Sequence, residues 1–145
     1  MDFMTAIDVG ASGLKAERTR LNVISMNLAN AKTTRTVEGG PYRRKEVIFK
    51  ETDVASPFSG AMQSALDREV KGVRVESVQD DKRPLRQVYE PNHPDANEEG
   101  YVSYPDINIV EEMTNMLAAM RSYEANVTTI STAKTMFSKA LEIGR

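Results

Sequence analysis

Few residues of this sequence are of a type and spacing that could perform catalysis or bind a metal. His93 is the single histidine, it lies in the loop-like run PNHPD, and there is no cysteine. Catalytic triads and metal sites need partner groups that a rigid scaffold places, so we interpret His93 as a turn residue. Asp80 and Asp81 are followed at once by two basic residues. This pattern is typical of a charged hairpin turn rather than of a catalytic carboxylate pair.

Two further motifs are excluded by what surrounds them. The glycine-containing run GASG at residues 10–13 is not followed by the Lys-Ser/Thr pair of a phosphate-binding loop. The basic run at 43–45 is short, and the net charge is −2 with a pI of about 5.5. Such a run is more typical of a solvated strand face than of a nucleic-acid site. We therefore expect no enzyme, no cofactor, no metal and no nucleic-acid partner.

The composition indicates an ordered protein with a modest core. Of 145 residues, 40% are hydrophobic, 28% charged and only 6% aromatic, with eight methionines and no tryptophan. A short, aromatic-poor chain is expected to draw stability from a partner. The sequence holds no apolar run of 18 residues, so we expect no direct membrane insertion. The early residues MDFMTAIDVG lack a basic region, so no cleavable secretory signal is expected.

A seven-residue repeat marks the C-terminal segment. Apolar residues alternate at spacings of four and three from residue 109 to 141, a pattern that predicts a coiled-coil seam. The seam consists of Ile109, Met113, Met116, Met120, Tyr123, Val127, Ile130, Phe137 and Leu141, interrupted by Lys134. Asn108 and Glu111 have capping-box spacing and Gly144 supplies a stop, so a helix is predicted over 108–143.

The N-terminal segment repeats this pattern more weakly. Its seam consists of Ile7, Leu14, Leu21 and Leu28, spaced by sevens, with Ile24 at a companion position. Gly10 and Gly13 each cost about 1 kcal/mol relative to alanine in a helix interior, so we expect a helix over about 5–31 with a soft start. Two heptad helices at opposite ends of a chain can satisfy each other by pairing antiparallel.

The middle of the chain has strand and turn signals instead. Polar and apolar residues alternate over 42–49, 71–78 and 85–90, which predicts strands. The tract 91–100 is predicted to be a loop, and 52–69 either a loop or a short helix. The predicted class is α+β, with long terminal helices pairing as an antiparallel coiled coil around a small β-rich middle. Residues 1–35 and 106–145 would form one discontinuous coiled-coil domain, and 36–105 the β-rich and loop segment.

The helix faces raise two questions about neighbouring subunits. Asparagine is a poor helix former on a merely solvated face. The asparagines that lie off the seam therefore either set the register of the helices through specific hydrogen bonds or are ordinary surface groups. They are Asn22, Asn27, Asn30, Asn115 and Asn126. Leu117, Ala118 and Ala119 widen the methionine-rich stripe. Periodicity leaves open whether this stripe completes an intramolecular bundle or packs on other subunits.

Both ends of the chain resemble the flagellar axial proteins of the rod and hook. The run SGLKAERTRLNVISMNLANAKTT resembles their N-terminal signature through Leu21, Asn22, Ser25, Asn27, Leu28, Ala29, Asn30 and Thr33. The run EEMTNMLAAMRSYEANVTTISTAKTMFSKALEIG resembles the C-terminal signature through Met120, Arg121, Tyr123, Ala125 and Asn126. The longer stretch TTRTVEGGPYRRKEVIF is similar to the proximal-rod members of the family.

The resemblance implies a structural subunit of the bacterial flagellar basal-body rod, without cofactor or reaction. Such subunits polymerise through their terminal helices into the torque-transmitting shaft, which spans the periplasm. The implied partners are proximal and distal rod proteins, further copies of the chain, and the flagellar type III apparatus that exports it from the cytoplasm without a cleaved signal. Asn27 and Asn30 would set helix register against neighbours, and 31–36 would be a flexible exit from the tube wall. The alternative is a stand-alone coiled-coil adaptor or dimerisation module.

Overall fold

The structure is a computed structural model that describes residues 3–53 and 70–144. The described residues form, in chain order, α1 (Phe3–Ala29), β1 (Lys45–Asp53), β2 (Lys71–Asp80), β3 (Arg86–Tyr89), β4 (Tyr101–Tyr104) and α3 (Ile109–Ile143). This arrangement confirms the predicted class of two long terminal helices around a small β-rich middle. Most of the ambiguous segment 52–69 lies outside the described residues.

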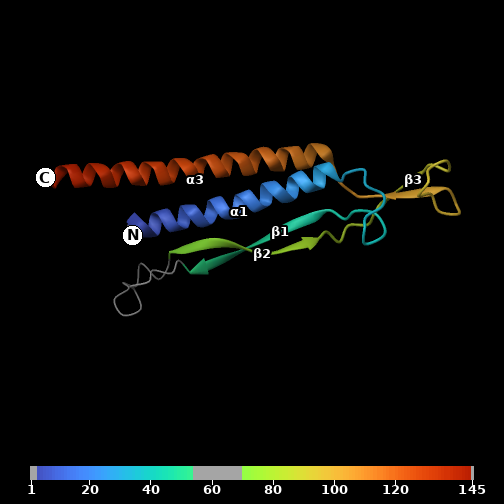
Figure 1. Ribbon diagram of the computed structural model, residues 1–145, viewed down its shortest axis with the longest axis horizontal. Helices are drawn as coiled ribbons and strands as arrows, with labels where there is room; N and C mark the ends of the chain where they lie inside the picture. The colour runs from blue at the N-terminus through green and yellow to red at the C-terminus, as the bar shows by residue number, and fades with distance from the viewer. Residues whose placement is uncertain (1–2, 54–69, 145) are drawn as a thin grey trace.

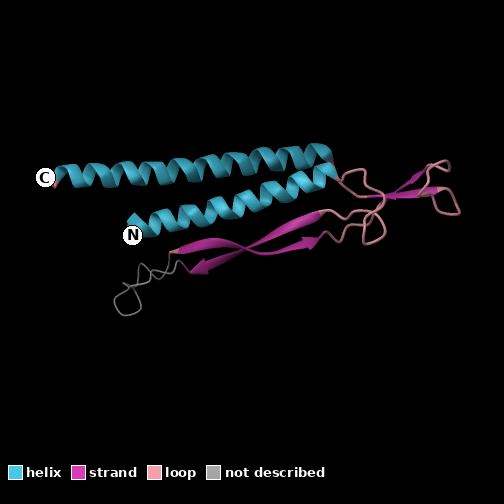
Figure 2. Ribbon diagram, viewed as in Figure 1, coloured by secondary structure: helices cyan, strands magenta, loops and turns pink. Residues whose placement is uncertain are grey.

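The elements stack in three layers. α1 is the middle layer, with α3 packed along one side and the β1–β2 ribbon along the other (Figures 1 and 2). The two helices run antiparallel, as predicted, so both chain ends lie at the same end of the molecule, and α3 extends beyond the start of α1 (Figure 1). The β3–β4 hairpin projects at the opposite end. Among the described residues, no helix combines the length and apolar character needed to cross a membrane.

Two glycines let the helices approach closely. Gly10 and Gly13 are buried, and a Cβ atom added at either would lie 2.8 Å from an α3 side-chain atom, Cγ1 of Ile130 or Nδ2 of Asn126. α1 begins at Phe3 and continues unbroken through both glycines. The close packing that the glycines permit offsets their low helix propensity.

The core of the described residues is thin. Its buried hydrophobic side chains are few and mostly small: Ala16, Val23, Ile24, Tyr42, Val102, Ala119 and Ala133. Each helix therefore buries only part of its apolar surface within the chain. Much of the hydrophobic content stays on the outside of the molecule.

The two ends of α3 test the capping signals predicted from the sequence. Oδ1 of Asn108 accepts hydrogen bonds from the backbone nitrogens of Val110 (3.0 Å) and Glu111 (3.4 Å), which confirms the predicted N-cap of α3. The helix ends at Ile143 as predicted. Gly144 follows with φ −82°, so this helix end does not use the left-handed conformation that glycine often provides.

The β1–β2 ribbon is antiparallel and edged by charge. Lys45 pairs with Asp80 at one end and Asp53 with Lys71 at the other, and the register shifts between Ile48 and Phe49. The Lys45–Asp80 and Lys71–Asp53 pairs are also ion pairs. The predicted strands at 42–49 and 71–78 are thus found with shifted ends, and exposed cross-strand charges of this kind add only a little stability.

The β3–β4 hairpin differs in part from the prediction. β3 lies within the predicted 85–90 strand and the 91–100 loop is present, but β4 was not predicted. Residues 80–83 do not form a hairpin turn, because β2 and β3 belong to separate sheets. Gly100 has φ +83°, and its missing Cβ leaves room for the ring of Tyr89. This ring lies edge-on to that of Tyr101, with 5.3 Å between the two ring centroids.

The close helix approach predicts a steric effect at Gly10. Gly10→Val should lower the free energy of unfolding by about 1–3 kcal/mol, because the added side chain would overlap Ile130. Ala11→Val adds the same side chain at an exposed neighbouring position and should cost less than about 1 kcal/mol. Urea unfolding of both variants measures the difference. Equal losses would show that the helices are not packed as closely as described.

Candidate functional site

The interior is most polar where α1 ends and β1 begins. The amide of Asn27, only 1% exposed, donates from Nδ2 to the carbonyl oxygen of Lys45 (2.9 Å) and to Oε2 of Glu112 (3.2 Å). Its Oδ1 accepts from the nitrogen of Lys45 (2.9 Å) and the hydroxyl of Tyr42 (3.0 Å). Every hydrogen-bonding capacity of the amide is used. Asn27 therefore joins α1 to β1 and α3.

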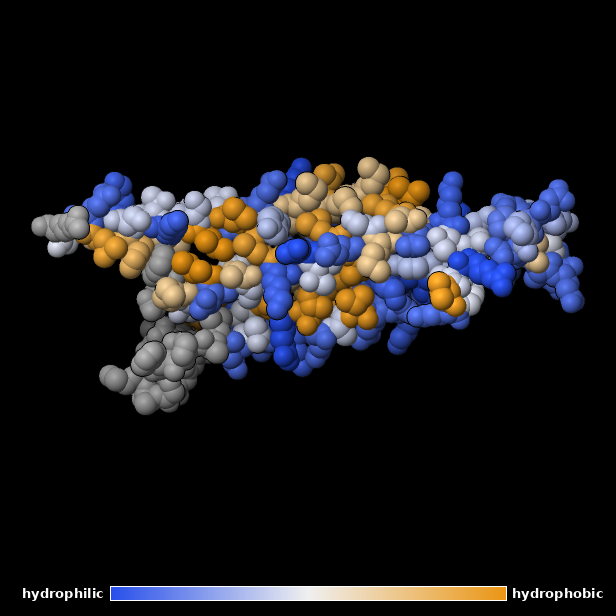
Figure 3. Space-filling model, viewed as in Figure 1, coloured by the Kyte–Doolittle hydropathy of each residue, from blue (hydrophilic) through white to orange (hydrophobic). Residues whose placement is uncertain are grey.

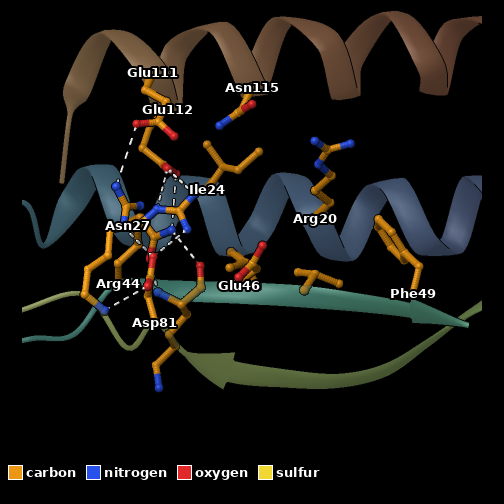
Figure 4. A pocket seen from close by; sticks show the side chains of 14 residues that line it. Arg20, Ile24, Asn27, Arg44, Glu46, Phe49, Asp81, Glu111, Glu112 and Asn115 are labelled. Carbon is orange, nitrogen blue, oxygen red and sulfur yellow. Dashed lines mark hydrogen bonds and ion pairs between the residues drawn. The ribbon is translucent and has the colours of Figure 1, made fainter. Parts of the chain in front are cut away.

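A chain of alternating charges continues from this amide. Glu112, 1% exposed, accepts at Oε1 from Nε (2.9 Å) and Nη2 (2.8 Å) of Arg44. Nη1 of Arg44 donates to Asp81 (3.2 Å), which also accepts from Nε of Arg83 (2.7 Å). The side chains of Asn27, Arg44 and Glu112 converge between the helices and the ribbon (Figure 4). We refer to Asn27, Arg44 and Glu112 as the polar cluster.

The surroundings of the cluster shift the pKa values of two nearby groups, the Asp81 carboxyl and the Tyr42 hydroxyl. The pKa of the Asp81 carboxyl is lowered, chiefly by the hydrogen bond from the Arg83 side chain, with Arg44 adding to the effect. Burial raises the pKa of the Tyr42 hydroxyl, so Tyr42 stays protonated and can donate to Asn27. An unpaired buried carboxylate would cost several kcal/mol. The guanidinium of Arg44 is what makes a buried Glu112 tolerable.

The face of α3 that packs on α1 is offset from the predicted seam. This inner stripe is buried or half-buried and consists of Glu112, Met116, Ala119, Tyr123, Asn126, Ile130 and Ala133. Within the predicted seam, Met116, Tyr123 and Ile130 are half-buried, whereas Ile109, Met113, Met120, Val127, Phe137 and Leu141 are exposed. The predicted seam is thus divided between the side of α3 that faces α1 and its exposed surface. Glu112, Asn126 and two alanines take the inner positions instead.

The displaced apolar residues form a stripe on the outside of α3. This outer stripe consists of Val110, Met113, Leu117, Met120 and Val127, whose exposed fractions range from 44% to 72%. Hydrophobic side chains gather along the helix pair, whereas the end that carries β3 is mostly hydrophilic (Figure 3). An exposed apolar stripe of this kind, interrupted by Glu124 between Met120 and Val127, is typical of an interaction surface.

The predicted N-terminal seam lies inward in part. Ile24 is buried, and Ile7, Leu14, Leu21 and Leu28 are half-buried. α1 is covered on two sides, so its buried set also includes Ala16 and Val23, which heptad reasoning did not select. The N-terminal helix therefore has less surface available to a further neighbour than α3 has.

The predicted register residues separate into four groups. Asn27 is bonded wholly within the chain, which corrects the expectation that it faces a neighbour. Asn30 and Thr33 bond each other (3.1 Å) just beyond α1, in a run that hydrogen-bonded turns hold together. Asn126 is half-buried against Gly13. Asn22 and Arg121 are exposed.

Sequence reasoning missed the residues that build the cluster. The sequence pattern places Arg44 in a solvated basic run and does not select Glu112. A signal was nevertheless present, since Glu112, Ala119, Asn126 and Ala133 follow one another at intervals of seven. Their small or polar character hid this second heptad beside the apolar one.

A groove of about 480 Å³ opens beside the cluster, between α1, α3 and β1. Arg20, Glu46 and Phe49 line it together with cluster residues (Figure 4). Over residues 3–53 and 70–144, no three acidic or histidine side chains gather as a metal site would require. His93 lies in a turn, as predicted, where its Nδ1 accepts from the nitrogen of Asp95 (3.1 Å).

Two family models match the ends of the chain that form this helix pair. Residues 7–35 match the model described as flagella basal body rod protein, and residues 98–143 match that of the flagellar basal body rod FlgEFG protein C-terminal region. Both models describe flagellar basal-body rod proteins. The resemblance of the two signatures to flagellar axial proteins is thereby confirmed.

Full-length relatives narrow the assignment. The chain is 45% identical to the flagellar basal-body rod protein FlgC of Borreliella burgdorferi, covering 99% of this chain and 98% of the relative. It is 41% identical to FlgC of Bacillus subtilis over 97% of each chain, and 37% identical to FlgC of Salmonella typhimurium over all of both. The chain belongs to the FlgC family of flagellar basal-body rod proteins. It is a structural rod subunit, not an enzyme.

The hydrogen bond from Tyr42 to Asn27 can be tested by removing one hydroxyl. Tyr42→Phe should lower the free energy of unfolding by about 0.5–1.5 kcal/mol, since the buried amide loses one donor. Tyr101→Phe, at an exposed ring, is the matched control and should change stability little. Urea unfolding compares them. Equal effects would mean that the Tyr42 hydroxyl does not support the cluster.

The Asp81 carboxyl predicts a pH dependence. Its pKa is lowered in the folded chain, so its contribution to stability is fully present above the unfolded pKa of about 3.9 and is lost as pH falls through the folded pKa. The stability difference between the native chain and Asp81→Asn should therefore shrink below about pH 4. Asp8→Asn, at an exposed position, is the control. A pH-independent difference for Asp81→Asn would contradict the charge network.

Proposed function

We propose that this rod subunit polymerises through its terminal helices and that the outer stripe of α3 packs on the helices of neighbouring subunits. The observation that carries the proposal is the exposure of Val110, Met113, Leu117, Met120 and Val127 along one face of a long helix. Packed side by side, such subunits would build the shaft that transmits torque.

The energetics favour association over an isolated subunit. Full burial of a valine, leucine or methionine side chain is worth about 1.5–3 kcal/mol. The outer stripe offers several such side chains at helical spacing, so a neighbouring helix could bury them together. Helix-on-helix packing of this kind needs no cofactor and would be repeated at every subunit. The free energy of burial at each contact would thus add up along the assembly and make it stiff.

The proposal divides the chain into an assembly unit and a middle segment. Residues 1–35 with 106–145 would form the discontinuous helical domain that enters the shaft, and 36–105 the segment outside it. The layer order supports this division, since the β1–β2 ribbon lies on the side of α1 opposite α3. The ribbon therefore leaves the outer stripe uncovered.

The finer assignment of partners and place rests on the family. We infer that the partners are proximal and distal rod proteins and further copies of the chain, with the subunit itself in the proximal rod. Delivery through the flagellar type III export apparatus, without a cleaved signal peptide, would bring it from the cytoplasm to the periplasm-spanning rod. The three relatives described above are all basal-body rod proteins, which supports a place in the basal body.

A charge on the outer stripe tests the proposal. Met120→Glu should abolish incorporation into isolated basal bodies and motility, because it places a carboxylate in the buried contact. Ser122→Glu, at an exposed position on another face of the same helix, should leave both intact. Circular dichroism and thermal unfolding establish that both variants fold.

Two results would count against this function. Normal rods from folded Met120→Glu protein would remove the outer stripe from the assembly interface. A closed dimer of the native chain, disrupted by Met120→Glu and unable to grow, would instead favour an adaptor or dimerisation module. Sedimentation velocity distinguishes a closed dimer from open growth.

A further inference from the structure

α3 carries two alternative heptad faces of seven residues each, which share three of these residues. Both include Met116, Tyr123 and Ile130. The inner stripe completes this set with residues at 112, 119, 126 and 133, and the alternative completes it with the residues one position later. A rotation of α3 about its own axis, smaller than the roughly 100° between consecutive residues, would exchange them.

Hydrophobic burial alone favours the face that is outside. Met113, Met120 and Val127 are 55%, 44% and 44% exposed. Their inward neighbours one residue earlier are a carboxylate, an alanine and an amide. Burying the three larger apolar side chains would remove more apolar surface from water. The fourth exchange would replace the buried Ala133 by Lys134, whose ammonium would have to extend to solvent. Some other interaction must therefore hold α3 in the observed orientation.

The polar cluster supplies that interaction. Glu112 reaches Arg44 and Asn27 at 2.8–3.2 Å only because it points toward α1 and β1. A rotation that turned Met113 inward would move this carboxylate away and leave the Arg44 guanidinium, 14% exposed, without one of its two acidic partners. Gly13 also favours the observed orientation of α3, since it leaves room for the inward amide of Asn126.

We propose that the polar cluster selects the rotational register of α3 on α1, and so keeps the apolar residues of the outer stripe outside for assembly. The second half of this statement rests on the proposed function; the first half does not. Buried polar groups can favour one packing over another even where apolar replacements would be as stable. The cluster would thus act as a specificity device rather than as a source of stability.

The absence of cysteine from the sequence permits a direct test of helix rotation. A single thiol is introduced as Ala119→Cys or Met120→Cys, at positions that are 0% and 44% exposed. Reaction with a maleimide is timed on dilute, monomeric full-length protein. With the cluster intact, the thiol at 120 should react at least about tenfold faster than the thiol at 119, because opening a packed helix is rare.

Removing the cluster should reverse this order. In a Glu112→Leu/Arg44→Met background, both polar partners become apolar, α3 is free to bury its larger side chains, and the thiol at 119 should become the faster. Glu112→Gln keeps the shape but removes the charge that pairs with Arg44, so the preference for the thiol at 120 should weaken. Thermal unfolding of each background confirms that the chain is folded.

Several outcomes would overturn the proposal. If the thiol at 120 stays the faster in the double variant, the cluster does not set the register. If both thiols react at the rate of urea-unfolded protein, no alternative packing exists and the proposal fails equally. An unchanged preference for the thiol at 120 in Glu112→Gln would show that the ion pair between Glu112 and Arg44 does not hold the register.

Assembly measured on the same variants separates the two proposals. A double variant with reversed reactivity that fails to enter basal bodies supports both. A reversed order with normal rods supports the register device and overturns the proposed use of the outer stripe. A native order in the double variant, together with loss of assembly by Met120→Glu, overturns the register device and leaves the proposed function standing.

Discussion

The burial of one carboxylate constrains the whole arrangement. Glu112 can lie 1% exposed only while Arg44 and Asn27 bond it. Arg44 stands just before β1, so the start of the ribbon must be held against the end of α1 and the first turns of α3. Asp81, at the exit of β2, binds the same guanidinium. The three layers are thus joined at one end and extend away from it along the length of α1.

The rest of the helix contact has a different character. Away from the cluster, α1 and α3 meet through glycines, alanines and a few larger side chains, which allows close approach but buries little apolar surface. The polar end specifies how the helices pair, and the small-residue stretch lets them pair tightly. Neither part of this contact buries all the hydrophobic residues of α3. The subunit is therefore complete as a fold while much of its apolar surface stays in water.

Local signals in the sequence predicted the elements well and the contacts poorly. The Asn108 cap, the end of α3 and three of the strands follow from capping and alternation, because these depend on neighbouring residues. Glu112 and Arg44 are 68 residues apart, and no local pattern shows that they meet. The heptad analysis preferred methionines to alanines, since periodicity measures apolarity and not the partner opposite. Helix propensity likewise takes no account of the partner opposite a residue. It therefore shows the cost of Gly10 and Gly13 in α1 but not the close helix approach that they permit.

The shared location of the two chain ends has a practical consequence. The first and last described residues lie at the same end of the long axis, whereas the β3–β4 hairpin lies at the other (Figure 1). A purification tag or fluorescent fusion at either terminus would crowd the same region, beside the part of α3 that extends past α1. The hairpin loop at 90–100 faces solvent at the far end. It offers a place for a label that leaves the helical end unencumbered.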